Sequence, residues 1–138
     1  MVDEVRVERL LRAVADDLAF LRIEAGADRD RRDDPAWLRA IKYAFVTAIE
    51  ACVDVAQHLC ASEGWGPPAT NADAMLVLGR HGVLESDLAR QLGRAVGFRN
   101  VLVHAYVTVD GALVVRRLED LSDLDGFASA VAHWMTEV

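Results

Sequence analysis

The feature that most constrains the fold of this 138-residue chain is a long segment, residues 35–63, whose apolar side chains recur every three or four positions. That period places them on one face of an α-helix. Asp34 followed by Pro35 is typical of a helix start, because Asp accepts hydrogen bonds at the N-cap and Pro fits the first helical position. Gly64 is expected to stop the helix. The apolar stripe consists of Trp37, Ile41, Phe45, Ala48, Cys52, Val55 and Leu59.

The segment before this helix predicts a second helix and a charged connection. Residues 4–25 carry apolar side chains at helical spacing and are followed by Gly26, a residue that commonly ends helices. Residues 27–34 read ADRDRRDD, in which the two signs of charge nearly cancel. We expect a solvated loop there rather than a binding patch.

Three further helices are predicted downstream from residues that can cap helix N-termini. Asn71, Ser86 and Ser122 each precede an apolar periodic segment. The first of these helices should close at His81 and Gly82, and the second should run on into residues 96–106. The sequence therefore predicts a single all-α domain over residues 1–138, a bundle of about five helices.

Residues 107–118, VTVDGALVVRRL, allow two interpretations. Asp110–Gly111 between alternating Val and Leu is typical of a β-hairpin. The same stretch is compatible with a loop followed by a short helix. Because two strands alone are marginally stable, we favour a loop or one short helical turn within an all-α bundle.

Charge and hydropathy limit the classes of function. The net charge of −7 argues against a protein coated with nucleic acid but allows a small basic site. Apolar runs fall well short of the ~20 residues needed to span a bilayer. Residues 1–12 alternate charged and apolar side chains, unlike a signal peptide. We expect a cytoplasmic protein with no membrane segment.

The cysteines and histidines do not predict a metal or a disulfide. Cys52 and Cys60 are eight residues apart in the long helix, which is about 12 Å of rise and too far for a disulfide. Both are expected to be small core residues. His58 and Cys60 are the nearest approach to a metal-binding pair, but no second pair with ligand spacing exists. No metal and no cofactor is expected.

Polar side chains are concentrated in GFRNVLVHAYVTVD, residues 97–110. At about 100° per residue, Arg99, Asn100, His104 and Tyr106 share one front of a helix. Val103 lies in the middle of that front, so the front is not simply a wet face. The opposite, apolar side of the helix is expected to carry Phe98, Val101, Leu102 and Ala105.

Each of these polar residues has an ordinary structural interpretation as well as a chemical one. Arg99 and Asn100 could be solvated, His104 could be a satisfied surface or core residue, and Tyr106 could pack at a helix end. Chemically, an arginine offers a fixed cation to a phosphate, and a histidine exchanges a proton near neutral pH. Together these are the groups that phosphodiester cleavage through a ribose 2′-OH requires.

The spacing of Arg99, His104 and Tyr106 matches the R-x4-H-x-Y form of the HEPN motif. The surrounding GFRNVLVHAY resembles HepT, the HEPN toxin family of HepT/MntA toxin–antitoxin pairs. Residues 43–60 and 83–100 are similar to the family's second helix and its motif-bearing helix. The resemblance covers roughly residues 5–135.

This resemblance implies a dimeric HEPN-type helical bundle in which two motifs face each other, and a metal-independent endoribonuclease. His104 would be the general base or acid. Arg99 would bind the scissile phosphate, and Asn100 would orient His104 or the phosphate. Tyr106 would be the residue that a partner antitoxin, a minimal nucleotidyltransferase, adenylylates to silence the toxin. The implied substrate is RNA, and no DNA-binding role is expected.

Two functions remain open at this point. The first is the ribonuclease toxin, which the intact Arg99 and His104 favour. The second is a non-catalytic HEPN-type helical module that binds a nucleotidyltransferase through the same front. For an enzyme with this acidic total, RNA binding should depend on arginines gathered at the dimer cleft. Candidates besides Arg99 are Arg94, Arg116 and Arg117.

Overall fold

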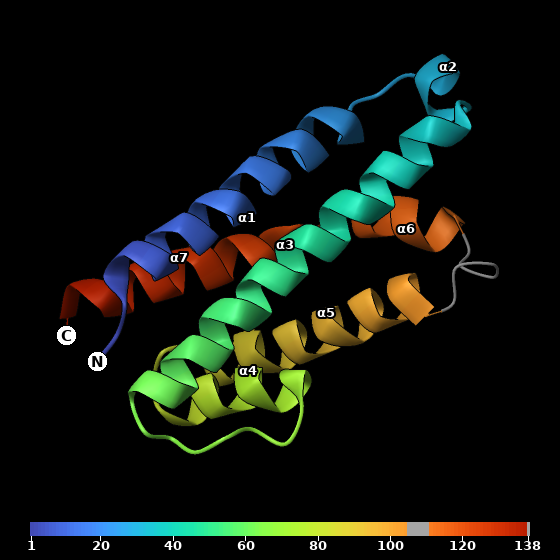
Figure 1. Cartoon of the computed structure of the whole chain (residues 1–138). Helices are drawn as coiled ribbons and strands as arrows, with labels where there is room; N and C mark the ends of the chain where they lie inside the picture. The colour runs from blue at the N-terminus through green and yellow to red at the C-terminus, as the bar shows by residue number, and fades with distance from the viewer. Residues whose placement is uncertain (105–110, 138) are drawn as a thin grey trace.

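The computed structural model describes residues 1–104 and 111–137. Within these ranges the chain forms seven α-helices and no β-strand, which confirms the predicted all-α class (Figure 1). The helices in chain order are α1 (Glu4–Ala25), α2 (Arg29–Arg32), α3 (Pro35–Ser62), α4 (Asn71–Arg80), α5 (Ser86–His104), α6 (Gly111–Arg117) and α7 (Ser122–Glu137).

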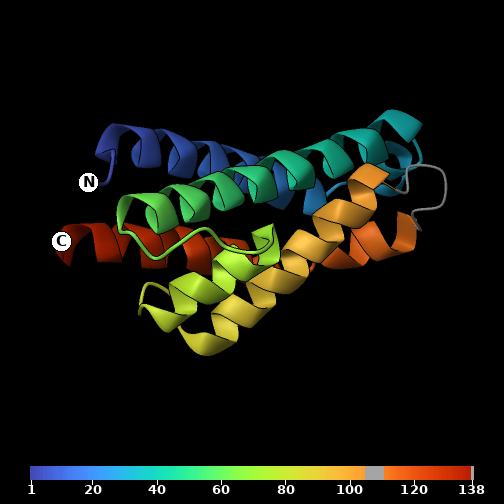
Figure 2. The ribbon, with the colours of Figure 1, turned by 60° about the horizontal axis from the view of Figure 1, so that its bottom comes forward.

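The long helix α3 is the centre of the bundle. It runs antiparallel to α1, and it contacts each of the other described helices (Figures 1 and 2). The helices α4 and α5 form a closely packed pair, and α7 packs against α1, α3 and α5. Both ends of the chain lie at the same end of the bundle (Figures 1 and 2).

The predicted stripe of α3 is the core. All seven of its side chains, from Trp37 to Leu59, are buried. By length and composition alone α3 could cross a membrane, but 61% of its apolar window is buried inside the bundle. The apolar face is therefore accounted for by helix packing. Its largest fully buried partners are Val7, Val14 and Leu21 of α1, Met75 and Leu78 of α4, Leu92 of α5, and Leu124 and Phe127 of α7.

The expectation of a solvated loop over residues 27–34 was wrong in part, because this segment contains the one-turn helix α2 and docks onto the bundle. Arg31 binds Glu24, a carboxylate at the end of α1 that is only 6% exposed, and Trp37 Nε1 donates to the same group at 2.9 Å. Arg32 donates to the carbonyl oxygens of Ala25 and Ala27 at 2.6 and 3.0 Å. Arg32 thus satisfies carbonyl oxygens at the end of α1 and just beyond it.

The three residues predicted as N-caps, Asn71, Ser86 and Ser122, are instead the first residues of their helices. Thr70, not Asn71, is the N-cap of α4, and its hydroxyl accepts from the backbone N–H of Asp73 at 3.0 Å. Ser86 and Ser122 are the first residues of their helices rather than caps. The backbone N–H of Ser122 donates to the Asp120 side chain at 2.9 Å. Several adjacent residues could each cap these helices, and side-chain geometry decides which one does.

The hairpin interpretation is wrong for residues 111–117, which form the helix α6. This agrees with the favoured alternative of a loop and a short helical turn. Val114 is fully buried, so α6 contributes to the core. The cysteines also agree with expectation: Cys52 and Cys60 are buried and free. Burial raises the pKa of both thiols, which keeps them in the unreactive protonated form.

Candidate functional site

Arg99 lies on the second-last turn of α5 and is fixed by a residue from α3. Its Nε and Nη2 donate to Oε1 of Glu50 at 3.2 and 2.6 Å. The Arg99 side chain is 22% exposed and that of Glu50 is 44% exposed. The guanidinium is therefore at the surface but held in one orientation, because both bonds converge on one carboxylate oxygen.

Asn100 completes the support of this guanidinium. Its Oδ1 accepts a hydrogen bond from Arg99 Nη1 at 2.9 Å. The resemblance had implied that Asn100 orients His104 or a phosphate. In the described structure its hydrogen-bond partner is Arg99, the preceding residue in the chain.

His104 is the last residue of α5 and is exposed. It follows Arg99 by five residues, which is about 7.5 Å of rise along the helix. Within the described ranges of the chain, no hydrogen bond to its ring is present. An exposed imidazole of this kind is accessible to a ligand.

Tyr106 and Ala105 lie outside the described residues, so the predicted sharing of one front can be followed only for Arg99, Asn100, Val103 and His104. Val103 is half-buried. The side chains of Arg99 and Asn100 are in contact, and His104 lies one helical turn beyond Asn100.

The apolar side of α5 is narrower than predicted. Leu102 is buried and Phe98 is half-buried, packing edge-on against Phe45 of α3 with ring centroids 5.4 Å apart. Val101, however, is 45% exposed. It lies at the margin of the apolar arc, where the neighbouring helices do not reach it.

Exposed apolar side chains are present on both helices that carry the Arg99–Glu50 pair. Val101 is on the same helix as Arg99, and Tyr43, 71% exposed, is on the same helix as Glu50. Tyr43 and Glu50 are seven residues apart, which is about two helical turns and therefore the same face of α3. Glu50 thus shares its face of α3 with the exposed ring of Tyr43, whereas Val101, two residues after Arg99, lies on a different side of α5.

Arg117 is not free to line an RNA path. Its guanidinium is 5.9 Å from the ring centres of both Phe45 and Phe98, and it forms an ion pair with the buried Asp123. Its Nη1 also donates to the carbonyl oxygen of Asp120 at 2.5 Å. Arg117 therefore holds the start of α7 against α3 and α5.

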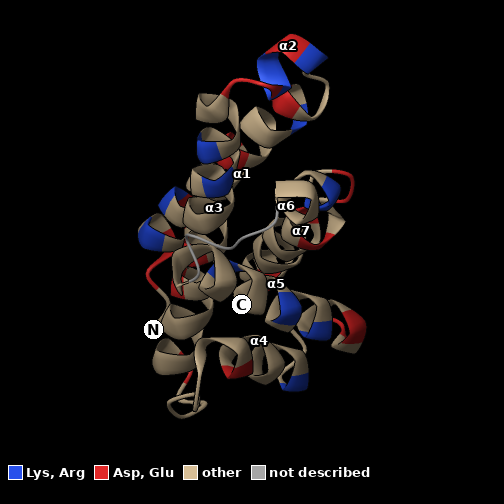
Figure 3. Cartoon of the chain, turned by 90° about the vertical axis from the view of Figure 1, so that its right-hand side faces the viewer, with Lys and Arg blue, Asp and Glu red and all other residues tan. Residues whose placement is uncertain are grey.

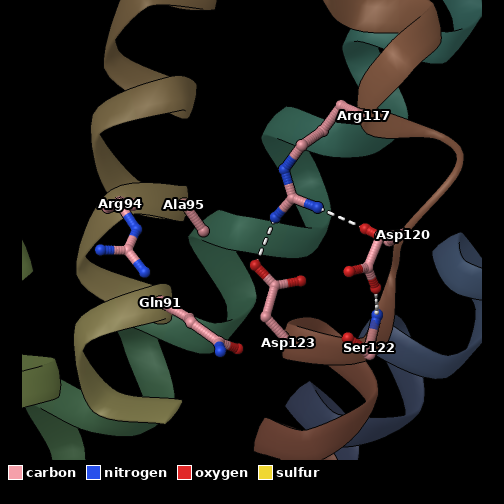
Figure 4. Close-up of a pocket in the computed structure, with 7 residues that line it drawn as sticks. All are labelled: Gln91, Arg94, Ala95, Arg117, Asp120, Ser122 and Asp123. Carbon is pink, nitrogen blue, oxygen red and sulfur yellow. Dashed lines mark hydrogen bonds and ion pairs between the residues drawn. The ribbon is translucent and has the colours of Figure 1, made fainter. Parts of the chain in front are cut away.

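A polar pocket of about 340 Å³ adjoins this clamp (Figure 4). Arg94 and Gln91 of α5 line one side, and Asp120 and Asp123 line the other. Arg116 lines a separate, smaller hollow beside α6. In the larger pocket, the carboxylates of Asp120 and Asp123 offset the positive charges of Arg94 and Arg117. The pocket therefore lacks the uniformly positive lining that an anion-binding site needs. The same mixture of charges is visible across the side of the molecule shown in Figure 3.

Glu50 is the residue that sequence reasoning missed. Periodicity cannot reveal a pair separated by 49 positions in the chain. One local signal was available: Glu50 is a single carboxylate within the otherwise apolar run AFVTAIEACV, residues 44–53. A charge in such a run calls for a partner. Among the described residues, no group of three or more side chains is arranged to hold a metal ion.

Comparison with known proteins confirms the family resemblance. Residues 8–131 match the model of the family described as Ribonuclease HepT-like. An mRNA nuclease HepT from Shewanella oneidensis is 29% identical over 83 residues, which are 59% of this chain and 62% of that protein. A tRNA nuclease HepT from Aphanizomenon flos-aquae is 34% identical over 61 residues, 44% of this chain and 42% of that protein. In both alignments the chain spans less than two thirds of the relative's length.

The fold has a counterpart among solved structures. A tri-AMPylated HEPN toxin of Shewanella oneidensis in complex with MNT antitoxin superposes with a TM-score of 0.86 at 20% identity, covering 96% of this chain and 99% of that one. At this identity the likeness establishes the helical architecture. Together with the match over residues 8–131, it places the chain in a known group: this chain belongs to the HepT-like ribonuclease family.

Proposed function

We propose that this protein is the toxin of a toxin–antitoxin pair and that it cleaves RNA without a metal ion. The observation that carries the proposal is the guanidinium of Arg99, held at the surface by Glu50 and Asn100, with an exposed His104 further along the same helix. Membership of a family of ribonucleases supports it. The cytoplasm, where RNA is available, is the proposed location.

The chemistry uses the ribose 2′-OH as the nucleophile. A neutral His104 takes the 2′-hydroxyl proton, the 2′-oxygen bonds to phosphorus, and the P–O5′ bond breaks. The departing 5′-oxygen takes a proton from a protonated histidine, for which the His104 of a second copy is available in a dimer. Arg99 stabilises the negative charge that develops on the phosphate oxygens. The products are a 2′,3′-cyclic phosphate and a 5′-hydroxyl.

A composite site formed by two copies is the second part of the proposal. Tyr43 and Val101 leave apolar surface exposed on the two helices that carry Glu50 and Arg99. A second copy packed against both helices would cover both side chains and bring two sets of Arg99 and His104 together around a two-fold axis. The same packing would gather positive charge locally on a chain whose total is −7.

Silencing by a partner is the third part. We propose that a minimal nucleotidyltransferase transfers AMP from ATP to the hydroxyl of Tyr106: the tyrosine oxygen bonds to the α-phosphorus, and pyrophosphate leaves. The toxin of similar fold that is AMPylated in complex with MNT antitoxin supports this assignment.

The test is cleavage of total RNA by the purified, unmodified protein in the presence of EDTA, followed by mapping of the new ends. We expect His104→Ala and Arg99→Ala each to lower cleavage by ~10²-fold or more, because each removes one transition-state interaction. Both variants should keep their helical circular dichroism. The matched control is His133→Ala, which changes an exposed histidine on α7.

A requirement for a divalent metal, or normal cleavage by His104→Ala, would contradict the proposal. A wild-type protein that binds the nucleotidyltransferase but leaves RNA intact would instead identify the non-catalytic helical module.

A further inference from the structure

We infer that Glu50 is a positioning residue for Arg99, and that it sets which edge of the guanidinium faces an RNA phosphate; the inference rests on the proposed ribonuclease function. One oxygen, Oε1, accepts from both Nε and Nη2 of Arg99, at 3.2 and 2.6 Å. Asn100 Oδ1 takes a bond from Nη1 at 2.9 Å. Glu50 thus occupies the edge formed by Nε and Nη2, and Asn100 takes one of the two N–H groups of Nη1.

The count of donors shows what this leaves for a ligand. A guanidinium has five N–H groups in a rigid plane. Three are engaged by Glu50 and Asn100, so two N–H groups on Nη1 and Nη2 remain. Two donors are the number that a bidentate phosphate contact uses. Glu50 therefore selects the end-on edge of Arg99 for substrate.

The backbone that carries Glu50 is suited to this task. Its neighbours Ile49, Ala51 and Cys52 are all buried in the middle of α3, the helix that contacts every other described helix. A side chain projecting from a rigid element holds its partner more accurately than one on a loop. Without Glu50, the long arginine side chain would sample several rotamers.

The same carboxylate has a cost for substrate binding. Glu50 is 44% exposed, so its negative charge faces the solvent from which the RNA phosphate approaches. A like charge near the phosphate weakens ground-state binding, whereas correct placement of Arg99 favours the transition state. Removal of Glu50 should therefore move KM and kcat in different ways, which a purely structural ion pair would not do.

The experiment measures kcat and KM for cleavage of a short RNA oligonucleotide in EDTA by three variants of the full chain. Glu50→Ala should lower kcat by about 10²-fold, the scale of loss from a misplaced catalytic group, while KM falls or stays level. Glu50→Gln retains an oxygen at the position of Oε1 and should keep kcat within about threefold, because a neutral acceptor gives a weaker but similar bond. Asp54→Ala is the control, an exposed carboxylate one turn further along α3.

A second readout does not depend on activity. The Arg99 Nε–H resonance, assigned by its loss in Arg99→Lys, should be sharp and shifted in wild type and in Glu50→Gln. It should merge with the solvent-exposed arginines in Glu50→Ala. A wild-type kcat in Glu50→Ala, or an equal loss in Glu50→Gln and Glu50→Ala, would overturn the positioning role. If the wild-type protein itself left RNA intact, the ribonuclease proposal would fail first, and the catalytic role of Glu50 with it.

Discussion

At the scale of single residues, the site depends on a pair of opposite charges brought together from two helices. Arg99 alone would be a solvated cation on an acidic protein. Paired with Glu50 and bonded to Asn100, it becomes an oriented donor with part of its hydrogen-bonding capacity unused. The pairing also lowers the local positive charge. Selective RNA binding is therefore expected to rely on geometry and on two copies of the site more than on net charge.

Tyr106→Phe tests the regulatory assignment at this scale. The sequence spacing predicts that Tyr106 shares a front with Arg99, and we propose that an AMP phosphate on its hydroxyl would pair with Arg99 and repel RNA. We expect Tyr106→Phe to cleave RNA yet escape silencing by the cognate nucleotidyltransferase. The intact mass of the co-expressed wild type should rise by whole AMP units.

The control for this substitution is Tyr43→Phe, because Tyr43 is the other tyrosine of the chain and is 71% exposed. It should be silenced like wild type. Full inhibition of wild type by the partner without any gain in mass would show that silencing works by binding, and the role of Tyr106 would be withdrawn.

At the scale of elements, the joint between α1, α2 and α3 depends on one buried carboxylate. Glu24 accepts hydrogen bonds from Arg31 and from Trp37, so it ties the end of α1 to both following helices. The bonds from Arg31 are the main reason that the pKa of Glu24 is lowered from its ordinary value of 4.5, although desolvation acts in the opposite direction. The ionised form is thus favoured by folding.

Glu24→Gln should reveal this contribution through its pH dependence. A folded pKa below the unfolded one stabilises the protein above the unfolded pKa, and the effect is lost as pH falls through the folded value. We expect Glu24→Gln to unfold at a lower temperature than wild type at pH 7. The difference should shrink as pH falls below about 4.5. The control Glu8→Gln changes an exposed carboxylate, and its unfolding temperature should stay close to that of wild type at each pH. A difference in unfolding temperature between Glu24→Gln and wild type that did not change with pH would contradict a stabilising role of the ionised Glu24.

Local and non-local features differed in how far the sequence predicted them. The helix over residues 35–63 was predicted nearly to the residue, because Asp34, Pro35 and the apolar stripe are all local signals. The role of Arg117 was not, since its aromatic and carboxylate partners belong to α3, α5 and α7 and become neighbours only in the folded bundle. The exposure of Val101 likewise depends on where neighbouring helices end. Spacing in the sequence predicts Arg99 and His104 as site residues, whereas the pairing of Glu50 with Arg99 is visible only in the fold.

At the scale of the whole molecule, the bundle leaves apolar side chains exposed on α3 and α5, the two helices that carry the candidate site. We expect the protein to be a dimer by light scattering at micromolar concentration. Val101→Asp and Tyr43→Asp should each shift it toward monomer, because a charge at a packed interface is costly to desolvate. Cleavage should fall in parallel, since a composite site needs both copies.

Ile23→Asp is the matched control, because Ile23 is 73% exposed but belongs to α1. It should remain a dimer with normal cleavage. A wild-type monomer that cleaves RNA at full rate would contradict both the dimer and the composite site.

The contacts of α3 with every other described helix have a consequence for folding cooperativity. Opening any part of the bundle exposes part of the same central stripe, so partial unfolding has few low-energy routes that leave α3 intact. Backbone amides near Glu50 should then exchange with solvent mainly through global unfolding. The backbone that carries Glu50 would therefore support Arg99 for as long as the domain stays folded. Thermal motion on shorter timescales would be confined to the exposed side chains of the proposed site.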